Sequence, residues 1–295
     1  MPLAYHNGHF VDKNSLTLSP FDYGFNRSIA VYELVRVYGG VPFCLEEHLD
    51  RFDHSAQVLG INCSTERDDM LDAVEKLCAQ NQYPHSVIKI FLTIGECAQP
   101  GAGFGDSSGF APQLMIVEDE MHPLHPEAPK GLEIYKRGVA IKTVPFARDM
   151  PTVKSTNYTA GFVASRELGP QGWDDILFVH KDGYITEAAT SNVFCVIDGV
   201  LCTPSRGMLF GITRKTLLEL AKKLGIPTAE RDIMPADLAR ASEAFITGSY
   251  SELVPVRKID DVTFVVTMDG PVFSRLRQAY TAAIADACYP LAQAS

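Results

Sequence analysis

The 295-residue chain is long enough for two domains or one large α/β domain, and its composition, 46% hydrophobic and 21% charged, excludes disordered and collagen-like classes. With 36 acidic and 26 basic residues the formal net charge is −10, which disfavours nucleic acid and anionic membranes as partners. Seven scattered cysteines without a Cys-x-x-Cys pair, no signal-peptide pattern and no apolar run of about 18 residues predict a cytoplasmic protein without a membrane segment.

Apolar residues recur with two different periods in the first 120 residues. Alternating apolar and polar residues bounded by glycine-containing turns are typical of strands, and apolar residues recurring every three or four positions are typical of amphipathic helices. In chain order these patterns predict a strand hairpin over 4–10 that turns at Asn7-Gly8, a strand over 29–38, helices over 45–59 and 64–80, and strands over 87–94 and 114–117. We expect Ser64 or Thr65 to be the N-cap of the second helix.

A charged, proline-rich stretch, EDEMHPLHPEAPKG, follows these elements at 118–131. Such composition is typical of a linker between domains. The sequence therefore predicts an N-terminal α+β domain over 1–120, a linker over 121–132 and a C-terminal α+β domain over 133–295.

The second half is rich in hairpin turn signals, and Asp-Gly dipeptides separate several of its short apolar runs. The predicted elements are four strands forming a β-meander over 176–180, 184–186, 192–197 and 200–203, a helix that opens at Thr213, and a last helix over 274–289. Both domains are thus expected to combine helices with mostly antiparallel sheets.

Three segments of this half carry candidate chemistry. Lys154 stands in PTVKSTNY, Glu187 ends a strand in YITEAATSNVF, and Gly211 opens a helix in LFGITRK. A buried lysine can act as a nucleophile, a carboxylate can face a cation, and helix-start amides with a hydroxyl can bind phosphate. Taken singly, the same segments also fit a surface lysine, a solvent-facing turn and an ordinary N-cap at Thr213.

In combination, and at these spacings, the three segments resemble the signature of the class IV aminotransferases: a lysine, then T-E-x-x-x-S-N-hydrophobic-F, then G-I-T-R. The likeness extends over nearly the whole chain and includes DYG at 22–24, VYE at 31–33, EEHLDRF at 46–52 and TGS at 247–249. It implies the two-domain α+β fold (fold type IV) of the D-amino-acid and branched-chain aminotransferases, with pyridoxal 5'-phosphate (PLP) between the domains. It also implies a homodimer in which neighbouring loops complete each site.

The resemblance assigns roles to individual residues. Lys154 would form the imine with PLP and carry a proton between the substrate α-carbon and the cofactor. Glu187 would pair with the pyridine nitrogen and keep it protonated, so that the ring can accept electrons. The other implied cofactor contacts are Arg51, Ile212, Thr213 and Ser249 at the phosphate, Tyr158 and Asn192 at the O3′ side of the ring, and Leu209.

Among the branches of this family, the spacing of residues around Lys154 resembles that of the D-amino-acid aminotransferases. Asn157 follows Lys154 by three residues, as in the D-amino-acid and lyase branches, whereas the branched-chain pattern places its Asn-Tyr one residue later. The carboxylate-binding arginine usual in the D-amino-acid branch is replaced by Ile94, so another group must bind the substrate α-carboxylate. The candidates are Arg27, Lys89, Tyr32 and Tyr250, with Arg27 favoured because a guanidinium can bind a carboxylate bidentately.

The sequence thus predicts a PLP-dependent transaminase that moves an amino group between a D-amino acid and a 2-oxo acid, such as 2-oxoglutarate or pyruvate. A branched-chain L-amino-acid aminotransferase is one alternative. A lyase of the aminodeoxychorismate type, which releases pyruvate, is another. No metal is expected, because the histidines lack the neighbouring ligands typical of a zinc site.

Overall fold

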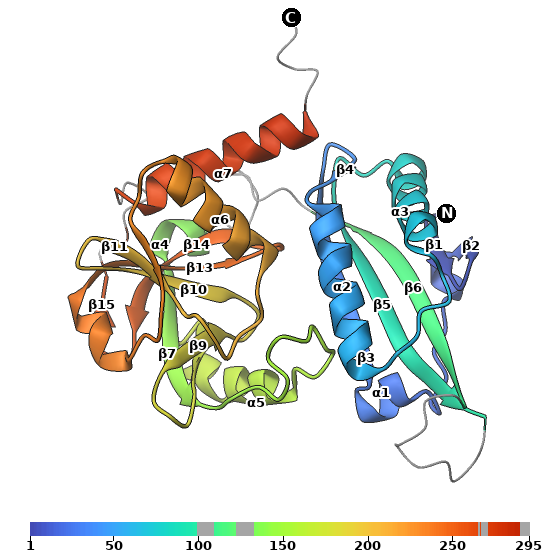
Figure 1. Ribbon diagram of the computed structural model, residues 1–295, viewed down its shortest axis with the longest axis horizontal. Helices are drawn as coiled ribbons and strands as arrows, with labels where there is room; N and C mark the ends of the chain where they lie inside the picture. Colours follow the sequence, from blue (N-terminus) through green and yellow to red (C-terminus); the bar gives the residue numbers. More distant parts are fainter. Residues whose placement is uncertain (99–108, 122–132, 265, 267–270, 290–295) are drawn as a thin grey trace, which may run out of the picture. The chain divides into compact units, whose positions relative to one another are not determined.

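The computed structural model describes residues 1–98, 109–121, 133–264, 266 and 271–289, and the chain divides into two α+β units (Figure 1). Unit 1 comprises 1–122, 153–157 and 287–295, and unit 2 comprises 123–152 and 158–286. The predicted α+β fold class agrees with this architecture. The predicted linker, 121–132, lies outside the described residues except for Met121.

The segment that carries the candidate lysine belongs to unit 1, whereas the sequence placed it in the C-terminal domain. Its backbone joins the strand over 30–38 directly: Tyr32 N donates to Lys154 O at 3.0 Å, and Thr156 N donates to Ala30 O at 3.2 Å. Because these bonds join residues far apart in the chain, local sequence patterns could not reveal them.

Unit 1 is built on a six-stranded sheet in the order β2-β1-β6-β5-β3-β4, with antiparallel neighbours throughout. Its strands are β1 (Leu3–His6), β2 (His9–Asp12), β3 (Ala30–Tyr38), β4 (Val41–Pro42), β5 (His85–Cys97) and β6 (Phe110–Glu120). The last two are longer than predicted, because their pairing continues past a bulge at Gly95. Gly95 has φ +82° and a Cβ there would lie 1.7 Å from Ala111 O, so only glycine fits.

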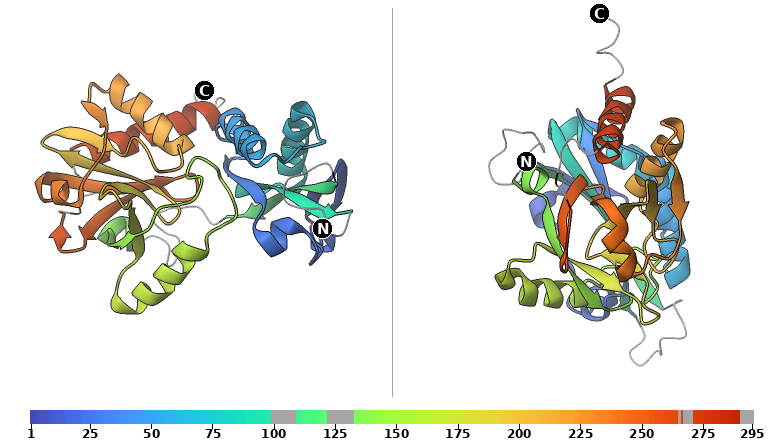
Figure 2. Two further views of the ribbon diagram at one scale, coloured as in Figure 1. Left: turned by 60° about the horizontal axis from the view of Figure 1, so that its bottom comes forward. Right: turned by 90° about the vertical axis from the view of Figure 1, so that its left-hand side faces the viewer.

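Helices α2 (Leu45–Leu59) and α3 (Arg67–Asn81) cover one face of this sheet (Figures 1 and 2). The bounds of α2 agree with the prediction, and Gly60 ends it in the left-handed conformation at φ +66°. The predicted N-cap of α3 was wrong, since Glu66 occupies that position. Asp68 and Asp69 then fall in the first turn, where carboxylates are favoured by the helix dipole.

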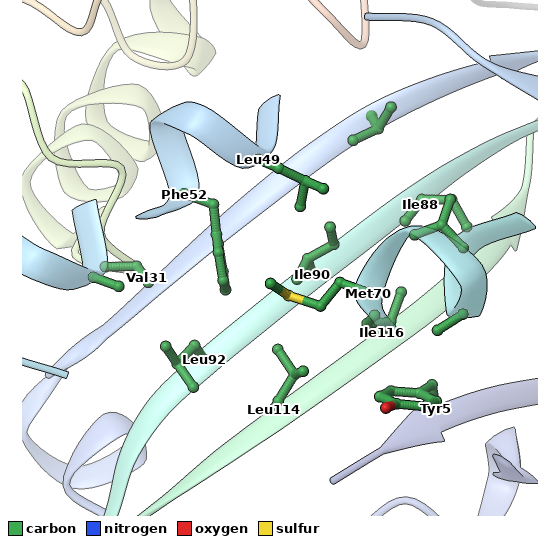
Figure 3. Packing of buried hydrophobic residues seen from close by; sticks show 14 of the residues in the cluster. Tyr5, Val31, Leu49, Phe52, Met70, Ile88, Ile90, Leu92, Leu114 and Ile116 are labelled. Carbon is green, nitrogen blue, oxygen red and sulfur yellow. The ribbon is translucent and has the colours of Figure 1, made fainter. Parts of the chain in front are cut away.

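The core of unit 1 lies between these helices and the sheet (Figure 3). Leu49 and Phe52 from α2 and Met70 from α3 point toward Ile90 of the sheet. The short helix α1 (Tyr23–Arg27) and the 3-10 helix η1 (Lys13–Ser15) complete the unit and were not predicted. The face of the sheet that packs against α2 and α3 is apolar. A charged residue on that face is unusual, and Glu33 of β3 is one.

Unit 2 contains a nine-stranded mixed sheet in the order β12-β11-β10-β13-β14-β7-β8-β9, with β15 beside β14. Its strands are β7 (Val139–Pro145), β8 (Asp175–Val179), β9 (Ile185–Ala188), β10 (Asn192–Ile197), β11 (Val200–Thr203), β12 (Thr228–Glu230), β13 (Ala241–Gly248), β14 (Glu252–Ile259) and β15 (Val262–Thr263). The predicted meander was wrong: β8 with β9 and β10 with β11 are hairpins, but β13, β14 and β7 lie between them. Turn signals specify each hairpin and not the order of hairpins in a sheet.

The helices that begin in unit 2 are α4 (Glu133–Arg137), α5 (Thr159–Leu168), α6 (Ile212–Lys223) and α7 (Phe273–Cys288), with 3-10 helices η2 (Gly169–Gln171) and η3 (Pro235–Arg240). Phe194 of β10 stacks on Phe245 of β13, and Phe273 of α7 packs edge-on against Phe245. Helix α5 was missed because its large apolar side chains, Phe162 and Val163, are exposed and form no buried stripe. No helix in the described part of the chain is long and apolar enough to cross a membrane.

Candidate active site

Lys154 is fixed in unit 1 through its backbone and its amine. Its N–H donates to Ser55 Oγ at 3.1 Å, and its carbonyl accepts from Tyr32 N at 3.0 Å. The amine lies 3.4 Å from Tyr32 Oη and 4.5 Å from the centroid of the Tyr32 ring. Tyr32 stacks in turn on Phe91 of the neighbouring strand, with ring centroids 5.9 Å apart. The amine of Lys154 is thus held against a supported aromatic ring.

A buried polar cluster lies beside this segment. Glu33 accepts from Arg51 through both carboxylate oxygens, at 2.7 and 2.8 Å, and His48 Nδ1 lies 2.7 Å from Glu33 Oε2. Ser55 links the cluster to the lysine, because its hydroxyl donates to Arg51 O at 2.8 Å and accepts from Lys154 N. The guanidinium of Arg51 is therefore held in one orientation by a bidentate pair.

Charge within the cluster is balanced. Burial alone would raise the pKa of the Glu33 carboxyl, but Arg51 and His48 hold it well below its ordinary value. Burial lowers the pKa of the His48 imidazole, and the positive charges of Arg51 and Lys154 lower it further. The negative charge of Glu33 raises this pKa but does not outweigh them. His48 is thus a neutral donor to an ionised Glu33, which compensates Arg51.

Glu33→Gln is expected to lower the free energy of unfolding by about 3–5 kcal/mol at pH 7, because Arg51 loses its buried counter-ion. Glu46→Gln, which breaks an exposed pair between Glu46 of α2 and Arg67 of α3, should cost less than about 1 kcal/mol. Urea unfolding measures both.

The pH dependence of this loss has a defined sign. Because the folded pKa of Glu33 is depressed, its contribution is complete above the unfolded value of about 4.3 and is lost as the pH falls below it. The difference between wild type and Glu33→Gln should therefore shrink in acid. A difference of equal size at pH 7 and at pH 3 would contradict this account of the cluster.

Unit 2 holds the second group of candidate residues around Glu187, which lies in the fully buried strand β9. Arg148 Nη1 donates to Glu187 Oε1 at 2.9 Å, and Leu209 N donates to Glu187 Oε2 at 3.1 Å. Asn192 Nδ2 donates to Leu209 O at 2.7 Å. The backbone of Leu209 therefore joins Glu187 to Asn192 and fixes the turn that leads into α6.

The start of α6 has the features of an anion site. Gly211 is its N-cap, and within the described part of the chain no side chain caps the helix and its first turn contains no acidic residue. A Cβ at Gly211 would lie 2.1 Å from Asn192 Oδ1, so this close approach requires glycine. The first N–H groups of the helix, at Ile212 and Thr213, are donors that a phosphate can satisfy.

Further polar groups follow at the end of β13. Thr247 pairs with Asn192 across the sheet, and its buried hydroxyl has no hydrogen-bond partner among the described residues. Ser249 is half-buried in the next turn. A helix start without a cap, a glycine-only approach and an orphaned hydroxyl fit a phosphate group, and Glu187 fits a pyridinium nitrogen.

A family model described as amino-transferase class IV matches residues 30–259, which span both groups of candidate residues. The chain belongs to the class IV aminotransferases. Enzymes of this family depend on PLP, so the predicted transaminase activity and the predicted cofactor are both confirmed.

Several individual class IV proteins are similar over most of their length. A Methanocaldococcus jannaschii protein assigned as a branched-chain-amino-acid aminotransferase is 32% identical, covering 94% of both chains. An aminodeoxychorismate lyase of Bacillus subtilis is 30% identical over 94% of this chain and 93% of its own. A D-alanine aminotransferase of Listeria monocytogenes is 28% identical over 96% of both. Among solved structures, the Escherichia coli branched-chain amino acid aminotransferase matches with a TM-score of 0.85 at 26% identity, covering 95% of this chain and 93% of that chain.

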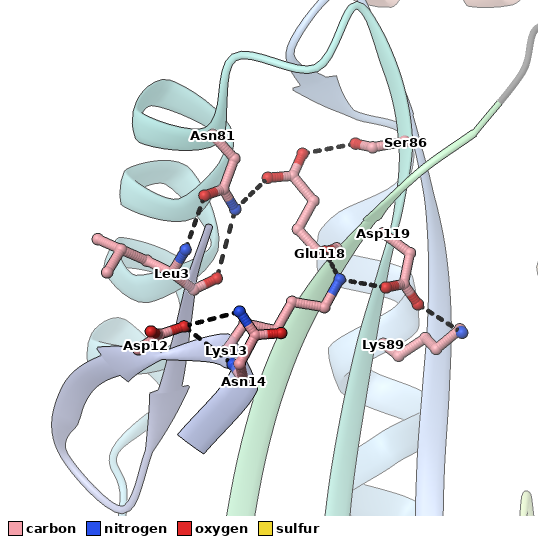
Figure 4. A network of polar contacts seen from close by, with 9 residues as sticks. All are labelled: Leu3, Asp12, Lys13, Asn14, Asn81, Ser86, Lys89, Glu118 and Asp119. Atoms are coloured by element: carbon pink, nitrogen blue, oxygen red, sulfur yellow. Dashed lines mark hydrogen bonds and ion pairs between the residues drawn. The ribbon is translucent and has the colours of Figure 1, made fainter. Parts of the chain in front are cut away.

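The candidate residues for the substrate carboxylate lie in different surroundings. Lys89 is paired with Asp119 at 2.7 Å, and Asp119 also binds Lys13 (Figure 4). Arg27 is the last residue of α1, is exposed, and donates to Asn26 O. Tyr250 is 55% exposed in the turn after β13.

The sequence assigned no individual role to four residues of these clusters: Glu33, His48, Ser55 and Arg148. Glu33 had a readable signal, since it interrupts the apolar inward face of β3, where charge is rare without a partner. Arg148 had none, because it lies in a loop after β7 without periodicity.

Proposed function

We propose that this class IV aminotransferase moves an amino group between a D-amino acid and a 2-oxo acid, 2-oxoglutarate or pyruvate. In this proposal Lys154 carries PLP. When bound, PLP supplies a ring that takes up the electron pair left by the departing α-proton. The protein contributes the groups that bind, orient and move protons.

Each group has a defined task in the proposal. The amine of Lys154 takes the proton from the substrate α-carbon and returns it on the cofactor side. Glu187 holds a proton at the ring nitrogen. Phosphate binding is assigned to the guanidinium of Arg51, the amides of Ile212 and Thr213, and the hydroxyl of Ser249. Tyr158 and Asn192 are assigned to the O3′ side of the ring.

The proposed preference for D-amino acids rests on the difference between Lys89 and Arg27 as ligands for the substrate carboxylate. Lys89 is already compensated by Asp119, whereas the Arg27 guanidinium is exposed and donates to a neutral carbonyl, so Arg27 is the better carboxylate ligand. The bulk of Tyr250 disfavours carboxylate binding at the turn after β13. If Arg27 holds the substrate carboxylate on the O3′ side of the cofactor, the α-proton that faces Lys154 belongs to the D-enantiomer, the opposite of the L-amino acids that branched-chain enzymes use. The similarity to a D-alanine aminotransferase supports this choice.

Separated enantiomers test the substrate. Purified enzyme is given D- or L-alanine, D- or L-glutamate, L-leucine or L-valine, each with a 2-oxo acid acceptor, and the D-forms are expected to be consumed. Exclusive use of L-leucine or L-valine would show a branched-chain enzyme. Pyruvate release from aminodeoxychorismate without an acceptor would show a lyase.

Arg27→Gln is expected to raise KM for the amino acid by about 10–100-fold, because one hydrogen-bonded charge contact is lost, with a smaller change in kcat. Lys89→Gln is the matched variant and should leave KM nearly unchanged. The reverse pattern would move the carboxylate site to Lys89.

We also propose a cytoplasmic homodimer. Phe21 and Phe25, 72% and 67% exposed, lie just before Arg27 in the chain, and large exposed aromatic side chains are typical of protein contacts. The dimer would bring Arg27 to the neighbouring subunit's substrate. All seven cysteines are free thiols, in keeping with a reducing compartment. Light scattering of purified enzyme measures the assembly, and a monomer with full activity would contradict it.

A further inference from the structure

Arg148 is held in place by the elements around it. Strand β7 pairs in parallel with β8, and Phe146 extends the pairing because its N–H donates to Val179 O at 3.1 Å. The Phe146 ring packs on Phe178 with centroids 5.0 Å apart. Two residues later Arg148 reaches Glu187 on β9, the antiparallel neighbour of β8. The ion pair therefore follows from strand pairing, and it is not a chance contact of a surface loop.

The pair is almost fully removed from solvent. The side chains of Arg148 and Glu187 are 11% and 6% exposed, and their shortest N–O distance is 2.9 Å. The guanidinium carbon also lies 5.9 Å from the centroid of the Tyr158 ring. A carboxylate at such depth is costly unless a cation compensates it, and without one it takes up a proton instead.

We propose that Arg148 is a positioning residue that keeps Glu187 ionised and oriented, so that the proton shared between Glu187 and the cofactor ring nitrogen resides on the nitrogen. This inference rests on the proposed pairing of Glu187 with that nitrogen. Arg148 occupies Oε1 and Leu209 N occupies Oε2, which fixes the plane of the carboxylate.

The proton is sensitive to a neighbouring charge because its two possible carriers are closely matched. A pyridine nitrogen and a glutamate carboxylate have similar proton affinities in water, so a modest electrostatic difference decides which of them holds the proton. A guanidinium 2.9 Å from the carboxylate lowers its proton affinity and favours the nitrogen. With an uncharged group in its place, burial favours protonated Glu187 and a neutral ring, which is a weaker electron acceptor.

The test is nitrogen NMR of holoenzyme reconstituted with PLP labelled with ¹⁵N in the ring, since the chemical shift reports directly whether that nitrogen is protonated. The wild-type enzyme and Arg240→Gln, which breaks an exposed ion pair in the same unit, are expected to show a protonated nitrogen. Arg148→Gln should show an unprotonated nitrogen and lose about tenfold or more in kcat with little change in KM. Arg148→Lys should restore the proton. A protonated nitrogen in Arg148→Gln would overturn the proposal.

Arg148→His provides a readout that a merely structural role would not move, and it applies if Arg148→Gln fails to fold. Histidine gains charge below its ordinary pKa of about 6.5, so the ring nitrogen should be protonated at low pH and lose its proton as the pH rises. A signal that does not change with pH would overturn the proposal.

Glu187→Gln separates failure of this inference from failure of the proposed site. A protonated nitrogen in Glu187→Gln would mean that Glu187 does not pair with the ring at all. Loss of the proton in Glu187→Gln together with its retention in Arg148→Gln would remove the role of Arg148 alone.

Discussion

Lys154→Ala is expected to lose more than about 10⁴-fold in kcat. Loss of a positioned proton carrier typically costs about 10²–10⁴-fold, and here the covalent attachment of the cofactor disappears with it. The Lys154→Ala variant should still bind PLP, but only by noncovalent contacts, since the groups proposed for the phosphate and the ring nitrogen remain. Its visible absorption at roughly 420 nm, expected for PLP linked to a lysine, should be absent.

The control is another lysine of the same unit. Lys76 is exposed on α3 and lies over the Phe10 ring, so Lys76→Ala should keep both the visible band and the activity. Steady-state kinetics and absorption spectra of the two variants, measured beside wild type, give the comparison. Retention of even 10% of wild-type kcat by Lys154→Ala would remove Lys154 from the reaction.

Glu187→Gln is expected to lower kcat by about 10²–10³-fold with little change in KM, because the lost interaction acts where charge develops in the reaction. The variant should also lose stability, since the buried charge of Arg148 loses its ion pair with Glu187. Breaking one side of a buried pair costs about 3–5 kcal/mol. Activity and stability therefore fall together, and a second variant must separate them.

The double variant Glu187→Gln with Arg148→Gln makes that separation. With both charges removed, the desolvation penalty on Arg148 disappears, and most of the lost unfolding free energy should return. Activity should stay low, because no acid remains beside the ring nitrogen. Kinetics and urea unfolding of the wild type, the two single variants and the double variant provide the cycle. Recovery of activity along with stability would assign Glu187 a structural role only.

Local patterns predicted the elements well where one turn or one face decides the conformation. The helix over 45–59 followed from its apolar stripe and Gly60, and the hairpin at Asn7-Gly8 from its turn. The meander failed because β13 and β14, distant in sequence, insert between the two hairpins. Helix α5 gave no signal, since its apolar residues face solvent. Sheet order and exposed helices depend on tertiary contacts that periodicity does not encode.

The residues of the candidate site also differ in whether local sequence patterns could identify them. Lys154, Glu187 and the Gly211 turn could be found because their chemistry is written in short motifs with fixed spacing. The partners of these residues could not: Ser55 lies 99 residues before Lys154, and Arg148 lies 39 residues before Glu187. Such pairs form through the folding of distant strands and helices. Sequence reasoning therefore identifies the reacting groups more readily than the groups that hold and charge them.

We propose above that the amine of Lys154 carries the cofactor covalently. Treatment of the PLP-loaded enzyme with borohydride, followed by proteolysis and mass spectrometry, locates the reduced adduct on a single peptide. We expect a pyridoxyl group on Lys154 in the peptide that contains PTVKSTNY. An adduct on any other lysine, or an active PLP-loaded enzyme that yields no adduct, would contradict it.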